Sequence, residues 1–106
     1  MDLRIKEMSK KEKVTLLRGE DYWHTYSLPR LNLNSLVLSD GPCGIRKEVN
    51  KKIETSVCFP SGALLASTFN KETAYLYGKT LGLEAKAYGI NILLGPAINI
   101  KRSPLG

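Results

Sequence analysis

The sequence predicts an α/β fold that contains parallel strands, and three observations support this prediction. The run 35–39 is apolar without polar alternation, which is typical of a strand buried on both faces. Further apolar runs cover 63–68 and 90–94. The amphipathic segment 71–88 joins these two runs, and a helical crossover between neighbouring strands implies that the strands are parallel.

The first expected element is a short helix over 10–18. Ser9 and Glu12 have the spacing of a capping box, in which the serine hydroxyl and the glutamate carboxylate each bond a backbone N–H at the helix start. Gly19 supplies the stop. The strand that follows ends at the turn 40–42, whose Asp-Gly-Pro sequence is a strong turn signal.

The second half is expected to contain the best helix of the chain, over 71–88, after an exposed charged loop over 46–57. Asn70 is a good N-cap for this helix. Gly78 and Gly82 lie beside its apolar stripe, and each costs about 0.8–1.0 kcal/mol relative to alanine, so we expect the helix to approach a sheet closely there. The stripe follows helical spacing and consists of Ala74, Tyr77, Leu81, Ala85 and Tyr88.

The composition is that of an ordinary globular domain. The chain has 106 residues, 42% of them hydrophobic and 25% charged, which argues against a disordered or collagen-like protein. It is too short for a complete α/β barrel, which needs roughly 250 residues. The 16 Lys and Arg residues exceed the 10 Asp and Glu residues, so the net charge is +6. These basic residues are scattered among acids, so we expect no nucleic-acid partner, and a small basic nucleic-acid binder is kept as an alternative.

The sequence contains no targeting or metal-binding signal. No stretch approaches the ~20 apolar residues of a membrane span, so no membrane partner is expected. Residues 1–7 lack the apolar core of a secretory signal, and we therefore expect a cytoplasmic location. Cys43 and Cys58 form no CxxC pair, and His24 cannot complete a zinc site with them at a usual spacing. We expect no metal, no cofactor and two reduced thiols.

Asp40 is the most informative candidate residue, because functional groups of parallel α/β folds gather at the carboxyl ends of strands. It is the only carboxylate at such a position. An ionised carboxylate accepts two hydrogen bonds side by side, which matches neighbouring hydroxyls of a sugar. The competing interpretation is a plain turn in which Asp40 caps its own backbone. No catalytic residue is predicted, because no two acids form an obvious acid/base pair and His24 has no nucleophile placed for a triad.

The segment 39–46, SDGPCGIR, closely resembles the SDGPxGLR motif of family 3 glycoside hydrolases, in their β-glucosidase branch. The segment 99–106, NIKRSPLG, resembles the start of the family's NIxRSPLGGRNFE. The resemblance covers essentially the whole chain, and the ordered set of pieces is specific although each piece alone is weak. The other pieces that fall in family order are Glu12-Lys13-Val14, Trp23-His24-Thr25, Leu28-Pro29-Arg30-Leu31, Cys58-Phe59-Pro60, Leu64-Leu65-Ala66-Ser67-Thr68 and Leu94-Gly95-Pro96.

This resemblance implies that residues 1–106 are the truncated N-terminal part of a barrel domain, the N-terminal portion of an incomplete (β/α)8 TIM-like barrel. It implies a retaining hydrolase that releases terminal non-reducing β-linked glucose from a β-glucoside or related sugar. Retention needs two carboxyl groups about 5–5.5 Å apart, and the family's Asp nucleophile and Glu acid/base match no segment here. We therefore expect the remainder of the parent enzyme as a partner, and we expect the isolated chain to be inactive and not to fold stably.

The resemblance also implies three substrate-binding residues. Asp40 matches the aspartate that hydrogen-bonds sugar hydroxyls in the −1 subsite, and Leu94 matches a hydrophobic residue lining the same pocket. Arg102 matches a position near the pocket, where an ion pair is expected rather than direct sugar contact, and Arg46 is interpreted in the same way. His24 is expected to be structural or at the edge of the site. The alternative function is a non-catalytic carbohydrate-binding or interaction module that keeps Asp40.

Overall fold

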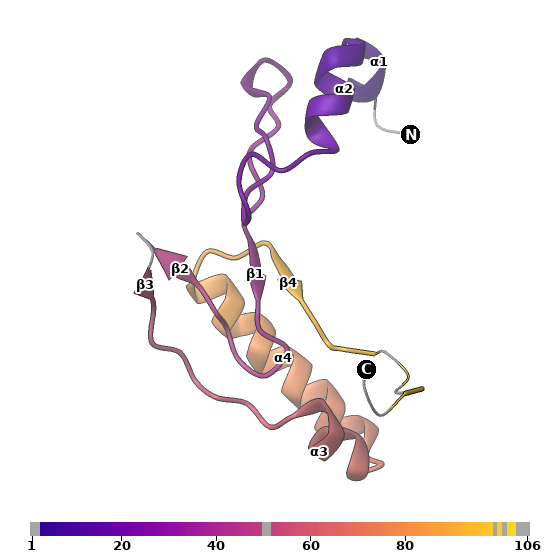
Figure 1. Cartoon of the computed structure of the whole chain (residues 1–106), viewed down its shortest axis with the longest axis vertical. Helices are drawn as coiled ribbons and strands as arrows, with labels where there is room; N and C mark the ends of the chain where they lie inside the picture. Colours follow the sequence, from indigo (N-terminus) through magenta and orange to yellow (C-terminus); the bar gives the residue numbers. More distant parts are fainter. Residues whose placement is uncertain (1–2, 50–51, 99, 101, 104–106) are drawn as a thin grey trace.

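The chain has an open, elongated shape (Figure 1). A computed structural model describes residues 3–49, 52–98, 100 and 102–103. Its extents are 48 × 32 × 31 Å and its Cα radius of gyration is 17.2 Å, against about 13 Å for a compact chain of roughly 100 residues. A lobe with two short helices, α1 (Arg4–Glu7) and α2 (Lys10–Leu16), stands at one end, and a twisted ribbon joins it to the body.

The capping box predicted at the start of α2 is present. The hydroxyl of Ser9 accepts a hydrogen bond from the Glu12 N–H at 3.2 Å, and Glu12 Oε2 accepts one from the Ser9 N–H at 2.8 Å. These bonds satisfy two backbone donors that a helix start leaves unpaired. The helix ends at Leu16 rather than at the predicted residue 18. The preceding helix, α1, was not predicted, because no side-chain cap marks its start.

Glu12 also joins α2 to a short 3-10 helix, η1 (Pro29–Leu31). Arg30 donates from Nε to Glu12 Oε1 at 2.7 Å and from Nη2 to Glu12 Oε2 at 2.6 Å. The same Nη2 donates to the backbone oxygen of Glu7 at 3.0 Å. One guanidinium therefore links both helices of the lobe to η1, in the two-pronged geometry that makes Arg–carboxylate pairs specific.

Glu12 makes the stability of this lobe depend on pH. Hydrogen bonds from Arg30, and then from Ser9, lower the pKa of Glu12 from 4.5 to about 2. Because the folded state favours the carboxylate, its stabilising contribution is complete above pH 4.5 and is lost as the pH falls toward 2. We expect Glu12→Gln to speed amide exchange over residues 4–16 near neutral pH, and this difference from the unchanged chain to vanish as the pH approaches the folded pKa. The exposed Glu20→Gln is the control; a difference that stays constant with pH would contradict the assignment.

Two parallel strands form the centre of the body, but they are not the predicted pair of 63–68 with 90–94. They are β1 (Leu38–Asp40) and β4 (Ile92–Leu94), and their register pairs Leu38 with Ile92 and Asp40 with Leu94. The expectation that the strands are buried on both faces is wrong for this chain, since Ser39 is the one buried residue of β1 and β4 has none. The described elements cover only part of the sheet surface.

The predicted main helix is α4 (Lys71–Ala87), which lies along one side of the strand pair (Figure 1). The side chain of Asn70 caps it by accepting from the backbone N–H groups of Glu72 at 2.8 Å and Thr73 at 3.1 Å. The apolar stripe faces a small core, in which Leu81 and Ala85 are buried and Tyr77 and Tyr88 are partly buried; its first member, Ala74, is exposed. The buried core residues are Ile45, Leu81, Ala85 and Ile90.

Two of the predicted elements are wrong. The run 63–68 is not a strand but belongs to a helix, α3 (Gly62–Ser67), which Ser61 caps by accepting from the Leu64 N–H at 3.3 Å. A short apolar run does not distinguish strand from helix, and its Leu and Ala residues favour a helix. The predicted loop 46–57 contains a small antiparallel hairpin of β2 (Glu48–Val49) and β3 (Lys52–Ile53). The β-α-β unit therefore runs from β1 through α4 to β4.

The close approach expected at Gly78 and Gly82 is also absent from the described part of the chain. A Cβ built on either glycine meets no atom within 4 Å outside its own helix. Both glycines instead border an apolar groove of about 430 Å³ between α4 and the segments that follow β1 and β4. The other residues lining this groove are Pro42, Leu65, Ala74, Tyr77, Leu81, Leu93, Gly95 and Pro96.

The chain exposes far more surface than a compact protein of its size. Its accessible surface is 8770 Å², against about 5,900 Å² expected for a folded monomer of this mass. Large apolar side chains contribute to the excess, with Phe69 96% exposed and Ile98 84% exposed.

No helix of the described residues has the length and hydropathy needed to cross a bilayer. Within the described ranges, no three His, Cys, Asp or Glu side chains lie close enough together to hold a metal ion.

Candidate functional site

Asp40 occupies the carboxyl end of β1, directly beside Leu94 at the carboxyl end of β4. Its side chain is half-buried, and its Oδ1 accepts a hydrogen bond from the Gly41 N–H at 3.0 Å. Among the described residues, no donor reaches its Oδ2. One carboxylate oxygen therefore caps the turn, and the other accepts no hydrogen bond from the described residues.

The Asp40 loop (residues 40–45) requires glycine at two positions. Gly41 has φ +132°, and a Cβ there would lie 1.9 Å from the backbone oxygen of Gly44. Gly44 has φ +125°, and a Cβ there would lie 2.3 Å from the backbone oxygen of Val57. Only glycine tolerates both the backbone angles and the close approach. The Arg46 N–H closes the loop by donating to the Asp40 carbonyl at 3.0 Å.

Of the three residues predicted to bind substrate, the structure brings two together, Asp40 and Leu94. Leu94 is 47% exposed and pairs with Asp40 across the strands. The next residue, Gly95, packs on the Asp40 loop, because a Cβ there would lie 3.0 Å from Cα of Pro42. Arg102 is exposed, and within the described residues no hydrogen bond or ion pair joins it to Asp40. Its role, like that of the other two, remains a prediction.

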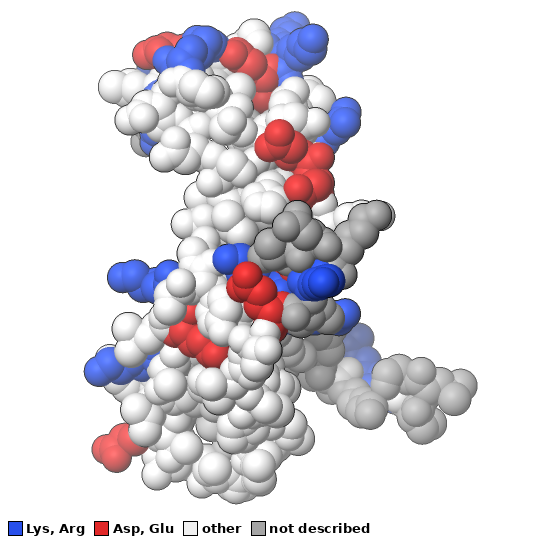
Figure 2. Space-filling model, turned by 90° about the vertical axis from the view of Figure 1, so that its left-hand side faces the viewer, with Lys and Arg blue, Asp and Glu red and all other residues white. Residues whose placement is uncertain are grey.

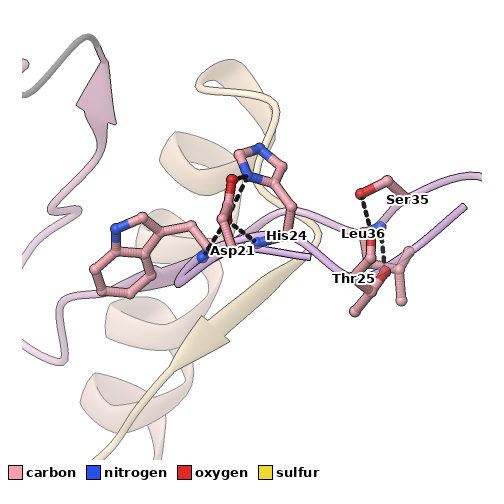
Figure 3. Close-up of polar contacts among 6 residues, drawn as sticks. Asp21, His24, Thr25, Ser35 and Leu36 are labelled. Carbon is pink, nitrogen blue, oxygen red and sulfur yellow. Dashed lines mark hydrogen bonds and ion pairs between the residues drawn. The ribbon is translucent and has the colours of Figure 1, made fainter. Parts of the chain in front are cut away.

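His24 belongs to a local pair that the sequence analysis missed. Both carboxylate oxygens of Asp21 lie close to His24 Nδ1, at 2.9 and 2.8 Å (Figure 3). Asp21 Oδ1 also accepts from the backbone N–H groups of Trp23 at 2.7 Å and His24 at 2.8 Å. The Trp23 N–H, followed by His24, lowers the pKa of Asp21. The signal was available in the sequence as an aspartate three residues before the histidine.

The segment that contains His24 is hydrogen-bonded to the segment leading into β1. Ser35 Oγ donates to the backbone oxygen of Thr25 at 2.6 Å, and Thr25 Oγ1 accepts from the Leu36 N–H at 2.8 Å (Figure 3). A hollow of about 320 Å³ lies beside this segment and β1. Its lining residues are Trp23, His24, Val37, Leu38, Arg46, Lys47 and Glu48.

Charged side chains of both signs lie on the surface of the molecule. On the face shown in Figure 2, acidic and basic side chains lie interspersed over the N-terminal lobe and the middle of the molecule, and the end that contains α3 is nearly free of charge. Titratable residues at the strand ends are sparse, so the arrangement can accept hydrogen bonds from a neutral polar ligand. It does not bring two carboxylates together for acid/base chemistry within the described residues.

Comparisons with known proteins give a consistent set of relatives, although no protein-family model matches the chain. The chain is 45% identical over 106 residues to the Neosartorya fischeri protein named "Probable beta-glucosidase J", covering 100% of this chain and 12% of the relative. It superposes on the crystal structure of the β-glucosidase from Kluyveromyces marxianus in complex with glucose, with a TM-score of 0.88 and 38% identity over 95% of this chain and 12% of that one.

A second solved structure gives the same result. The chain superposes on the GH3 β-glucosidase of Bifidobacterium adolescentis with a TM-score of 0.83 and 32% identity, covering 96% of this chain and 14% of that one. The chain therefore spans only about an eighth of the length of the curated relatives it matches.

Proposed function

Because the chain belongs to glycoside hydrolase family 3, in its β-glucosidase type, we propose that it acts as one segment of a retaining hydrolase that releases terminal non-reducing β-linked glucose. The observation that carries this proposal is the geometry of Asp40. Its carboxylate stands at the end of a parallel strand, and one of its oxygens accepts no bond from the described residues.

In this proposal Asp40 binds the sugar in the −1 subsite. A carboxylate oxygen is a strong acceptor for a sugar hydroxyl, and a hydrogen bond to a charged group contributes about 1.5–3 kcal/mol. Leu94 lines the same subsite from the neighbouring strand, and Arg102 approaches it through an ion pair in the parent enzyme. The glucose bound to the K. marxianus enzyme supports a sugar of this class as substrate.

We further propose that residues 1–106 form the N-terminal portion of a (β/α)8 barrel. The parallel pair of β1 and β4 with α4 on one side supports this proposal, because a barrel of this kind repeats a parallel strand followed by a helix. The open strand edges, the apolar groove beside Gly78 and Gly82, and the excess of exposed surface support coverage by the remainder of the parent enzyme. The nucleophile and the acid/base are supplied by that remainder, so the isolated chain is inactive.

A chimera tests the proposal. The 106-residue chain replaces the matched segment of the K. marxianus β-glucosidase, and turnover of an aryl β-glucoside is measured. We expect kcat/KM to stay within about tenfold of the host enzyme, which corresponds to about 1.4 kcal/mol. The isolated chain and the host without this segment serve as controls, and both are expected to show no turnover.

Two results would overturn the proposal. One is a chimera that folds, by circular dichroism and size, but does not hydrolyse the substrate. The other is turnover by the isolated chain. Saturable quenching of Trp23 fluorescence by glucose in the isolated chain, without turnover in the chimera, would instead support a non-catalytic sugar-binding module.

A further inference from the structure

Helix α4 holds the Asp40 loop through the hydroxyl of Tyr77. This hydroxyl lies 2.6 Å from the carbonyl oxygen of Pro42, inside the loop, and 3.0 Å from that of Pro60. Its single hydrogen is shared between the two acceptors. The ring meets Phe59 edge to face, with centroids 5.3 Å apart and planes at 76°. Tyr77 therefore fastens both the loop and the segment 56–60 to the helix.

Glu84 lies on the same face of α4, at position i+7 from Tyr77. Its Oε1 accepts a hydrogen bond from the Val57 N–H at 3.0 Å. Its Oε2 is buried and has no partner among the described residues. Burying a carboxylate oxygen without a partner costs free energy, and such groups in native structures call for an explanation. The bond from the Val57 N–H to Oε1 holds the backbone against which the Asp40 loop packs.

The segment 56–60 transmits both contacts to the loop. The Val57 carbonyl approaches Gly44 so closely that no Cβ fits between them. The Phe59 N–H donates to the carbonyl of Cys43 at 2.9 Å. A continuous path of packed and hydrogen-bonded groups thus runs from α4 through this segment to the loop that begins at Asp40.

From this path we infer that Tyr77 and Glu84 are positioning residues, which hold the Asp40 loop in the conformation that binds sugar. The inference rests on the proposed function of Asp40. A loop with glycines at 41 and 44 has a flexible backbone. The contacts of Tyr77 and Glu84 therefore determine what fraction of molecules holds the loop in the binding conformation. When only a fraction of molecules is competent, the apparent dissociation constant rises by the inverse of that fraction.

The chimera with Tyr77→Phe tests the inference, because this change removes the hydroxyl and keeps the ring beside Phe59. We expect the inhibition constant of glucose to rise about 3- to 10-fold, the effect of one net hydrogen bond. Tyr75→Phe is the matched control, since Tyr75 lies on the same helix and is 72% exposed. The inhibition constant does not depend on the concentration of active enzyme, so a partly folded preparation still reports on the loop.

Two variants of Glu84 provide a second test, in which the conservative substitution is expected to keep glucose binding. Glu84→Leu removes the acceptor for the Val57 N–H and is expected to raise the inhibition constant of glucose in the same range. Glu84→Gln keeps an oxygen that accepts from this N–H and is expected to restore the constant to within about twofold. Equal effects of the Leu and Gln variants would contradict a positioning role for Glu84.

A double-mutant cycle separates positioning from general stability. In an Asp40→Asn background, Tyr77→Phe is expected to lower kcat/KM no further, because the residue acts through Asp40. Additive losses, or equal inhibition constants for the Tyr77→Phe and Tyr75→Phe variants, would overturn the inference. If Asp40→Asn itself changes neither kcat/KM nor the inhibition constant, the proposed function fails, and this outcome is distinct from failure of the positioning role.

Discussion

Replacing Gly41 with alanine is expected to destroy the ordered Asp40 loop and to lower the free energy of unfolding by about 3 kcal/mol or more. The added Cβ would lie 1.9 Å from the backbone oxygen of Gly44 and 2.8 Å from its carbonyl carbon, at φ +132°. Both contacts are with backbone atoms, so no change of side-chain rotamer relieves them. The loop must open, and with it the hydrogen bond from the Arg46 N–H to the Asp40 carbonyl is lost.

Thermal unfolding of the chimera measures this effect. Gly62→Ala is the matched control, because a Cβ at Gly62 meets no atom within 4 Å. We expect the Gly62 variant to unfold at the same temperature as the unchanged chimera or slightly above it, since alanine is favoured over glycine in a helix. The Gly41 variant is expected to unfold at a clearly lower temperature or to be lost from the soluble fraction. Equal unfolding temperatures for the two variants would show that the loop does not have this conformation.

Replacing Asp40 with asparagine is expected to lower kcat/KM for an aryl β-glucoside by about 10- to 150-fold, the loss of about 1.5–3 kcal/mol for a hydrogen bond to a charged acceptor. Asparagine retains an oxygen that accepts from the Gly41 N–H, so the turn persists. The other oxygen is replaced by an NH2 group, which cannot accept a bond from a sugar hydroxyl. The change therefore separates ligand binding from loop folding.

The comparison for this variant is Asp21→Asn, a change of the same chemistry at the exposed turn before His24. We expect the Asp21 variant to keep kcat/KM within about threefold of the unchanged chimera, a difference of well under 1 kcal/mol. Both variants are expected to unfold at the same temperature as the unchanged chimera. Full activity of the Asp40 variant would remove the basis for placing this carboxylate in the sugar subsite.

Some elements could be predicted because they depend on neighbouring residues. Ser9 and Glu12 cap a helix across three positions, and Asn70 caps α4 through the N–H groups of the next residues. The prediction of a strand over 63–68 is wrong because the periodicity of so short an apolar run does not distinguish strand from helix; the helix propensity of its Leu and Ala residues and the cap at Ser61 favour the helix.

Within the candidate site, the position of Asp40 at a strand end could be predicted, because the Asp-Gly-Pro turn marks where the strand stops. Its pairing with Leu94 was not predicted, because the expected parallel partner of the strand 90–94 was the run 63–68, which is a helix. The supports of the loop could not be predicted. The sequence pattern places Tyr77 in an apolar stripe and gives no sign of a polar contact. Tyr77 and Pro42 are 35 residues apart, so no local pattern predicts the hydrogen bond between them.

The sequence by itself determined the helix caps, the main helix, the turn after β1 and the family resemblance, because short-range spacing and motif order carry this information. Only the tertiary structure decided which strands pair, which oxygen of Asp40 stays available, and how α4 holds the loop. The contacts of Arg30 with Glu12, Tyr77 with Pro42 and Glu84 with Val57 join residues 18, 35 and 27 positions apart. Such contacts form only after the chain has closed long loops, so their partners are chosen by packing and not by local sequence.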